Sequence, residues 1–165
     1  MGREALPGVP VIALPTTTAN VGLGPVSERL GSGAGVPVLI LCDPTLTLAA
    51  DAAATAADGM DALIHCLEAY RGTAWNPPAD GIALEGVRRA AAYLERAVMD
   101  GNDIEARREM LAAALNAGLA AQKGLGGVHA LALALEAEAR SHPAPRAAAC
   151  RPAAAGDDLQ RPCRG

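Results

Sequence analysis

The sequence predicts a mainly α-helical protein, in which an antiparallel helical bundle is preceded by a remnant of an α/β domain. Three observations lead to this fold class. From Thr47 onward, apolar residues recur at helical spacing between short turns that contain glycine, proline or asparagine. The 165 residues include no phenylalanine, one tryptophan and two tyrosines, so aliphatic residues must build the core, which favours closely packed helices. Only two short stretches near the N-terminus are typical of buried strands.

The two expected strands lie in residues 1–44, which we assign to the α/β remnant. Val9 to Leu14 is an apolar run that ends in Pro15-Thr16-Thr17, as expected for a strand entering a loop. Val36 to Cys42 is continuously apolar and is stopped by Asp43-Pro44. Because two strands do not make a stable α/β domain on their own, we expect the helices to form most of the fold.

Residues 45–140 are expected to form the helical part, with four or five antiparallel helices. Ala50 to Ala57 predicts an alanine-rich turn or a short helix, broken at Gly59. The helix that follows is expected to end near Arg71, because Gly72 is a residue type that commonly follows helix ends. Its predicted apolar stripe consists of Met60, Leu63, Ile64 and Leu67.

Three further helices are expected, two of them with clear start signals. Asn76 is a candidate N-cap, and Pro77 suits the first helical position after it. Asn102 is the candidate N-cap of the next helix, because Glu105 lies three residues later as in a capping box. A glycine-rich break at 124–127 precedes the last helix. The three helices are expected to end near Ala97, Gln122 and Arg140.

Residues 141–165 have a different character from the rest of the chain. They contain several prolines and almost no large apolar residues, so no periodicity survives and the composition indicates disorder. We interpret this tail as the product of a reading-frame error, because residues 156–163 can be encoded so that a one-base shift gives the apolar Val-Met-Ile-Phe-Asn-Ala-Pro. The alternative is a natural, locally evolved tail.

One pair of polar residues in the helical part has the spacing of a metal site. Asp61 and His65 are four residues apart, so on a helix they lie on one face, one turn apart. A carboxylate and an imidazole in this arrangement offer oxygen and nitrogen donors that suit iron or zinc. The same spacing is found in ordinary helical hydrogen bonds and ion pairs, so spacing alone leaves both interpretations open.

Three stretches carry a more specific signal. They read Gly-Met-Asp-Ala-Leu-Ile-His-Cys-Leu-Glu-Ala-Tyr from Gly59, Asp-Pro-Thr-Leu-Thr from Asp43, and Gly-Leu-Gly-Gly-Val-His-Ala-Leu-Ala from Gly124. Together they resemble the iron-containing (group III) alcohol dehydrogenase family, closely so from Val38 to about Arg140. The resemblance implies the fold of that family's helical C-terminal domain, which is of the dehydroquinate synthase-like type. It also implies that this chain is a truncated part of a longer, two-domain enzyme.

The resemblance assigns roles to several residues. It implies that Fe²⁺ or Zn²⁺ is held by Asp61, His65 and His129. The family's fourth ligand is a histidine further along the chain, and His142 lies near its position in a different local sequence. Glu68 could orient a ligand or could equally be an exposed helical charge. Where the family often has a histidine for proton transfer, this chain has Leu133.

The implied cofactor is NAD(P). Thr16 and Thr17 correspond to a strand end that helps line the cofactor cleft in the family, although simple termination of a strand explains them equally well. The glycine-rich segment with which the family binds the dinucleotide is absent from this chain. No catalytic residue is therefore assigned.

The function implied by the resemblance is metal-dependent transfer of a hydride between an alcohol, or the corresponding carbonyl compound, and NAD(P). The partner would be a small-molecule alcohol or aldehyde. Three alternatives stay open: a helical fragment that binds metal without turnover, a maleylacetate-reductase-like enzyme, and a product without a stable fold. Metal content and turnover together would separate them.

Composition excludes several other classes. The net charge of −4 gives no reason to expect nucleic-acid binding, and no apolar run reaches the roughly 18–20 residues that cross a bilayer. No signal peptide is evident, so a cytoplasmic location is expected. Helix faces that lack their usual partner domain favour self-association into a homo-oligomer. Reduced thiols without zinc-site spacing are expected at Cys42, Cys66, Cys150 and Cys163.

Overall fold

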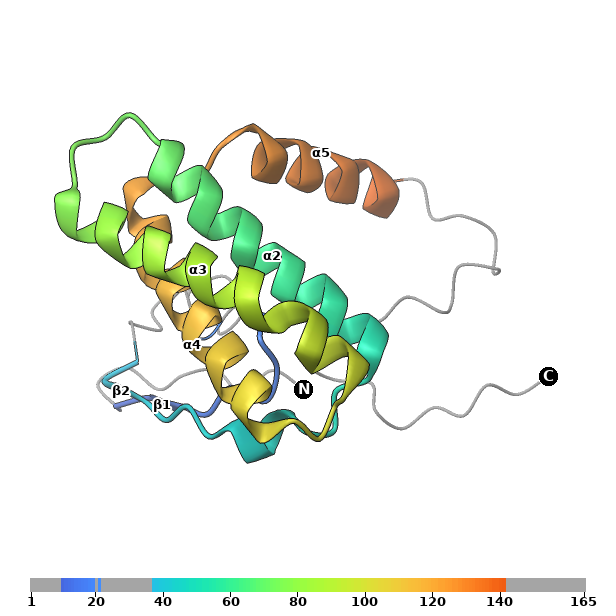
Figure 1. The fold of residues 1–165 in the computed structure, drawn as a ribbon. Coiled ribbons are helices and arrows are strands. Elements are labelled where there is room, and N and C mark those ends of the chain that lie inside the picture. Colours follow the sequence, from blue (N-terminus) through green and yellow to red (C-terminus); the bar gives the residue numbers. More distant parts are fainter. Residues whose placement is uncertain (1–9, 20, 22–36, 142–165) are drawn as a thin grey trace.

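A computed structural model of the chain describes residues 10–19, 21 and 37–141. The candidate ligand His142 and the tail to residue 165 lie outside these described residues. Three long helices pack side by side, α5 lies along α2 at one edge, and a short strand pair lies on the opposite side of the helices (Figure 1). The described part of the chain is thus mainly helical, as the sequence predicts.

The strands are much shorter than the apolar runs that predict them. β1 (Ile12–Ala13) pairs in parallel with β2 (Leu39–Ile40), with Ile12 opposite Leu39. Backbone hydrogen bonds extend the pairing by one residue beyond each end of β2. A 3₁₀ helix, η1 (Pro44–Thr47), follows, and the carboxylate of Asp43 accepts a hydrogen bond from the backbone N–H of Thr45.

α2 (Ala52–Arg71) is one continuous helix that Asp51 caps, so the expected break at Gly59 is wrong. Glycine weakens an isolated helix by about 1 kcal/mol relative to alanine. Tertiary packing explains its presence here, because a Cβ atom at this position would collide with the side chains of Leu94 and Met110. The absence of a side chain therefore permits the neighbouring helices to approach closely.

The buried face of α2 also differs from the predicted apolar stripe. Met60 and Leu67 are 47% and 41% exposed. The residues that α2 buries are mostly small, namely Thr55, Gly59, Ala62, Cys66 and Ala69. The face that packs against the bundle is therefore defined by close backbone approach instead of by large apolar side chains.

The next two helices begin at side-chain caps. α3 (Pro77–Met99) is capped by Asn76 with proline at its first position, as predicted. α4 (Ile104–Ala120) is capped by Asp103, so the assignment of Asn102 is wrong. Asn102 instead uses its backbone N–H to bond the Asp100 carboxylate within the turn. The Asp103 carboxylate accepts a hydrogen bond from the backbone N–H of Ala106 and also pairs with the guanidinium of Arg96.

After α4, the short 3₁₀ helix η2 (Ala121–Lys123) leads through Gly124, which has a φ of 111°, to α5 (Gly127–Ser141). Glycine adopts this left-handed backbone region without the steric penalty of other residues. The turn brings the start of α5 against α2. No helix among the described residues is long and apolar enough to span a membrane.

Candidate metal centre

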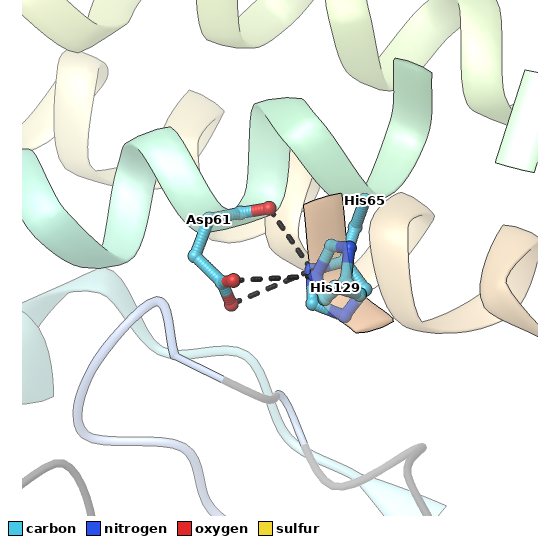
Figure 2. Close-up of side chains that lie close together, drawn as sticks. All are labelled: Asp61, His65 and His129. Atoms are coloured by element: carbon cyan, nitrogen blue, oxygen red, sulfur yellow. Dashed lines mark hydrogen bonds and ion pairs between the residues drawn. The ribbon is translucent and has the colours of Figure 1, made fainter. Parts of the chain in front are cut away.

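Two helices bring together the three residues that the sequence singles out. Asp61 and His65 lie one turn apart on α2, and His129 lies in the first turn of α5. Figure 2 shows the Asp61 carboxylate and the two imidazole rings close together. One donor atom from each residue lies within 4.8 Å of the others. The two helices thus converge on a single point with one oxygen and two nitrogen donors.

The distances define which atoms face this point. Nδ1 of His65 lies 3.4 Å from Oδ2 of Asp61, and Nε2 of His129 lies 3.5 Å from Oδ1 of the same carboxylate. The two ring nitrogens are 2.9 Å apart. The side chain of Asp61 is 48% exposed, whereas that of His129 is only 14% exposed. The site is therefore open to solvent on the side of the carboxylate.

Electrostatic coupling keeps Asp61 ionised. Partial burial alone would raise its pKa, but hydrogen bonding to His65 and the charges of both histidines outweigh burial and lower the pKa. Burial likewise favours a low pKa for His65, and the interactions with Asp61 reverse this and raise it. A carboxylate that is negative at neutral pH beside two imidazoles is a donor set that attracts a divalent cation.

The cofactor candidates lie on the loop after β1. Thr16 is exposed and Thr17 is half-buried. The Thr17 hydroxyl is hydrogen-bonded to the carboxylate of Asp58, which lies three residues before Asp61 on α2. Burial raises the pKa of Asp58 more than this hydrogen bond lowers it. The sequence did not point to Asp58, because local residue spacing cannot indicate a contact with a loop about 40 residues earlier in the chain.

Glu68 is not the exposed helical charge that one interpretation allowed. Its side chain is only 12% exposed, and its Oε2 lies 2.6 Å from Nδ1 of His129. Burial alone would raise the pKa of Glu68, but hydrogen bonds from His129 and from three backbone N–H groups lower it to about 2. Its position three residues after His65 indicates a place near the site, because residues three apart share a helix face.

A pocket of about 370 Å³ lies beside Glu68, between the end of α2 and the start of α5. Its lining includes the apolar side chains of Ile64 and Leu67 and the charged side chain of Arg71. None of the three converging residues lines it. The pocket is therefore adjacent to the candidate site and separate from its donor atoms.

Comparison with known proteins connects this geometry to a family. Residues 55–152 match the sequence model of the Fe-containing alcohol dehydrogenase family, C-terminal. A 4-hydroxybutyrate dehydrogenase of Cupriavidus necator is 46% identical over 132 residues, which cover 74% of this chain and 35% of that protein. An NAD-dependent methanol dehydrogenase of Bacillus methanolicus is 36% identical over 138 residues, which cover 76% of this chain and 36% of that protein.

Solved structures show the same relationship. A 1,3-propanediol oxidoreductase superposes with a TM-score of 0.69 and 34% identity, covering 79% of this chain and 37% of that chain. An alcohol dehydrogenase from Oenococcus oeni superposes with a TM-score of 0.70 and 29% identity, covering 82% of this chain and 39% of that chain. The chain spans about a third of the length of the curated relatives it matches. Because the family match extends over more than half of the sequence, this chain belongs to the Fe-containing alcohol dehydrogenase family.

Proposed function

We propose that Asp61, His65 and His129 hold Fe²⁺ or Zn²⁺ in an oxidoreductase that transfers a hydride between an alcohol, or the corresponding carbonyl compound, and NAD(P). One observation carries this proposal: a carboxylate oxygen and two imidazole nitrogens from two helices lie within 4.8 Å of one another. These donors suit iron and zinc. Three protein ligands also leave a coordination position for water or substrate, as catalytic sites require.

Each residue has a distinct task in this proposal. Bound at this point, the divalent cation would act as a Lewis acid toward the oxygen of the alcohol or carbonyl substrate. The ionised carboxylate of Asp61 balances part of the positive charge and faces the solvent from which substrate enters. The ring of His129 is mostly buried and that of His65 is half-buried. The two rings therefore limit the access of water to the cation from the side of the helices. Both rings must present an unprotonated nitrogen to serve as ligands.

The assignment of NAD(P) as hydride acceptor follows from family membership and from a relative that is named as NAD-dependent. Thr16 and Thr17 are our candidates for contact with this cofactor. Support comes from the hydrogen bond between the Thr17 hydroxyl and Asp58, because it holds the loop after β1 close to the helix that carries Asp61. Substituting Asp58 should therefore affect cofactor affinity more than metal affinity.

We propose a small-molecule alcohol or aldehyde as substrate, since the relatives are named for 4-hydroxybutyrate, methanol and 1,3-propanediol. A cytoplasmic location agrees with Cys42 and Cys66, which are free thiols. Self-association is also proposed, because α5 exposes three apolar side chains at helical spacing. These are Val128, Leu131 and Leu135.

The test starts from full-length chain that has been stripped of metal and then reloaded with Fe²⁺ or Zn²⁺. Absorbance of NAD(P)H is followed with short primary alcohols and, in reverse, with aldehydes or an oxo acid. We expect stoichiometric metal and metal-dependent turnover in the wild type, and loss of both in His65→Ala and His129→Ala. Glu95→Gln, on α3 away from the site, is the control and should behave as wild type.

The outcomes separate the alternatives. Turnover with the oxo acid alone would favour a maleylacetate-reductase-like activity, and such a reductase from Rhizobium is among the structural neighbours with a TM-score of 0.63 and 26% identity. Stoichiometric metal without any turnover would identify the chain as a metal-binding helical fragment. A chain that retains no metal would contradict the proposal altogether.

A further inference from the structure

We infer that Glu68 is the positioning residue of the metal centre: it holds Nδ1 of His129 and thereby makes Nε2 the ligand atom. This inference rests on the proposed metal site. It goes further by assigning the donor atom of one ligand and the residue that selects it.

The Glu68 carboxylate is saturated with donors from the start of α5. Its Oε2 accepts hydrogen bonds from the backbone N–H groups of Gly126 at 3.0 Å and His129 at 3.2 Å, and its Oε1 accepts one from Val128 at 2.7 Å. A fourth contact, 2.6 Å long, joins Oε2 to the side-chain Nδ1 of His129. One carboxylate thus caps α5 and orients a ring that α5 carries.

The contact with the ring also determines its tautomer. A neutral imidazole has one N–H group and one lone pair, and an ionised carboxylate can only accept hydrogen bonds. The proton of His129 must therefore lie on Nδ1, where it is donated to Glu68. The lone pair is then on Nε2, which lies 3.5 Å from Oδ1 of Asp61 and 2.9 Å from Nδ1 of His65. Histidines that ligate metals commonly donate their second N–H to a carboxylate in this way.

The two histidines differ in what fixes the positions of their rings. His65 lies on the same helix as Asp61, and its Nδ1 contacts the Asp61 carbonyl oxygen at 2.9 Å. Their relative placement is thus fixed by the geometry of α2. His129 comes from a separate helix, after a loop of glycines, so only contacts between α2 and α5 can fix its ring. Glu68 makes four hydrogen bonds at this junction, three of them to residues of α5 and one of these to the ring itself.

Gly126 provides the room for this arrangement. A Cβ atom there would lie 2.7 Å from Oε1 and 2.9 Å from Cδ of Glu68, so alanine would force the flexible carboxyl group to move. At the adjacent Gly127, an added Cβ would meet no atom within 4 Å. Gly126→Ala and Gly127→Ala are therefore a matched pair. Only the first should displace the carboxylate, and neither changes the charge.

The test measures Zn²⁺ affinity of the full chain by competition with a chromophoric chelator. Glu68→Gln keeps the shape of the side chain and removes its charge, and we expect Zn²⁺ to bind about 10- to 100-fold more weakly. Gly126→Ala should weaken binding in the same direction. Gly127→Ala and Glu85→Gln, the latter at a half-buried glutamate on α3, should retain wild-type affinity. Circular dichroism of each variant checks that the helices persist.

A second measurement reports on the ring itself. In ¹⁵N NMR of the metal-free wild type, His129 should carry its proton on Nδ1, and this preference should decrease in Glu68→Gln. A His129→Gln variant assigns the signal among the three histidines of the chain. Simple capping of α5 by Glu68 would not produce the change in tautomer.

Two results would overturn the inference: a wild-type His129 protonated at Nε2, or unchanged Zn²⁺ affinity in both Glu68→Gln and Gly126→Ala. A different result would show that the proposed metal site is wrong. A wild-type chain that binds no Zn²⁺ while His129 is protonated at Nδ1 would overturn the metal site, and would still support selection of the tautomer by Glu68.

Discussion

At the scale of single residues, a buried guanidinium joins three segments of the bundle. Arg107 is 2% exposed. It donates hydrogen bonds to the carbonyl oxygens of Ala50 and Gly101, both at 2.9 Å, and to the hydroxyl of Thr55 at 2.8 Å. Burial lowers the pKa of Arg107, yet an arginine remains charged at neutral pH. Its fork-shaped donors satisfy two half-buried backbone carbonyl groups and one buried hydroxyl.

Arg107→Ala should therefore be strongly destabilising. Removing the side chain takes the donor away from the buried Thr55 hydroxyl and from two half-buried carbonyl oxygens. We expect the free energy of unfolding to fall by about 3 kcal/mol in urea titrations. Arg88→Ala is the matched control, because Arg88 lies on the surface and pairs with Glu85 of the same helix. Equal stability of the two variants would show that the buried hydrogen bonds contribute nothing.

The candidate ligands differ in how far the sequence could predict them. Asp61 and His65 follow from helical periodicity, because residues four apart share a face. His129 could not be found this way, since its position depends on how α5 folds back on α2, and only the family resemblance pointed to it. Spacing places Glu68 on the same helix face as His65, but its contacts with residues 126–129 depend on tertiary packing in the same way. Local spacing gives one helix face, and tertiary packing determines what that face meets.

At the scale of elements, small residues allow the helices to approach closely. Gly86 of α3 lies against α2, where an added Cβ would overlap Sγ of Cys66 and approach Cβ of Asn116 to 3.1 Å. Burial raises the pKa of the Cys66 thiol to about 11, consistent with a thiol that serves only in packing. Large apolar residues dominate hydrophobic periodicity. The sequence therefore predicted the existence of α2 correctly but its buried face only in part, because Leu63 packs against the core whereas Met60 and Leu67 are exposed.

Gly86→Ala should destabilise the bundle by about 1–3 kcal/mol, because the extra methyl group overpacks this contact. Gly81→Ala, in the same helix, meets no atom within 4 Å and should stabilise the protein by about 0.5–1 kcal/mol. Thermal melts of the two variants provide the comparison. Adding Cys66→Ala to Gly86→Ala should recover part of the loss, and additive effects would disprove the proposed contact.

The start of α4 gives a pH-dependent prediction. Hydrogen bonds from the backbone N–H of Ala106 and the guanidinium of Arg96 lower the pKa of Asp103 in the folded state. The unfolded chain therefore binds a proton at Asp103 more readily than the folded chain does. The resulting stabilisation is complete above the ordinary carboxyl pKa of about 4 and is lost as the pH falls through the folded-state pKa.

Comparison with Asp103→Asn measures this contribution. Asparagine can still cap the helix but cannot form the ion pair with Arg96. In urea titrations, wild type should be more stable than the variant at about pH 7, and the difference should shrink toward about pH 3. A difference that does not change with pH would rule out the carboxylate as its source.

At the scale of the whole molecule, the chain consists of a packed bundle of α2, α3 and α4 with α5 attached through α2. The sequence predicted the bundle well, because turn residues separate strongly periodic segments. It overestimated both strands, since an apolar run does not reveal where its pairing partner ends. Ile12 and Leu39 are paired across a long sequence separation, which local patterns do not encode.

Because the proposed ligands come from both α2 and α5, metal binding should tighten the attachment of α5. At a free Zn²⁺ concentration of about 100 times Kd, linkage predicts a stabilisation of about 2.7 kcal/mol. Hydrogen exchange should slow for backbone amides at the start of α5 and change little at the centre of α3. Equal slowing in both helices would indicate general stabilisation without a link between α2 and α5.

The proposed function requires Asp61, His65 and His129 to share one metal ion. Anomalous X-ray diffraction from crystals of the zinc-loaded full chain, recorded on both sides of the zinc absorption edge, tests this most directly. We predict one strong anomalous peak at about 2.0–2.2 Å from an oxygen of Asp61, a nitrogen of His65 and Nε2 of His129. Bound zinc at any other place, with these three side chains unoccupied, would contradict the claim.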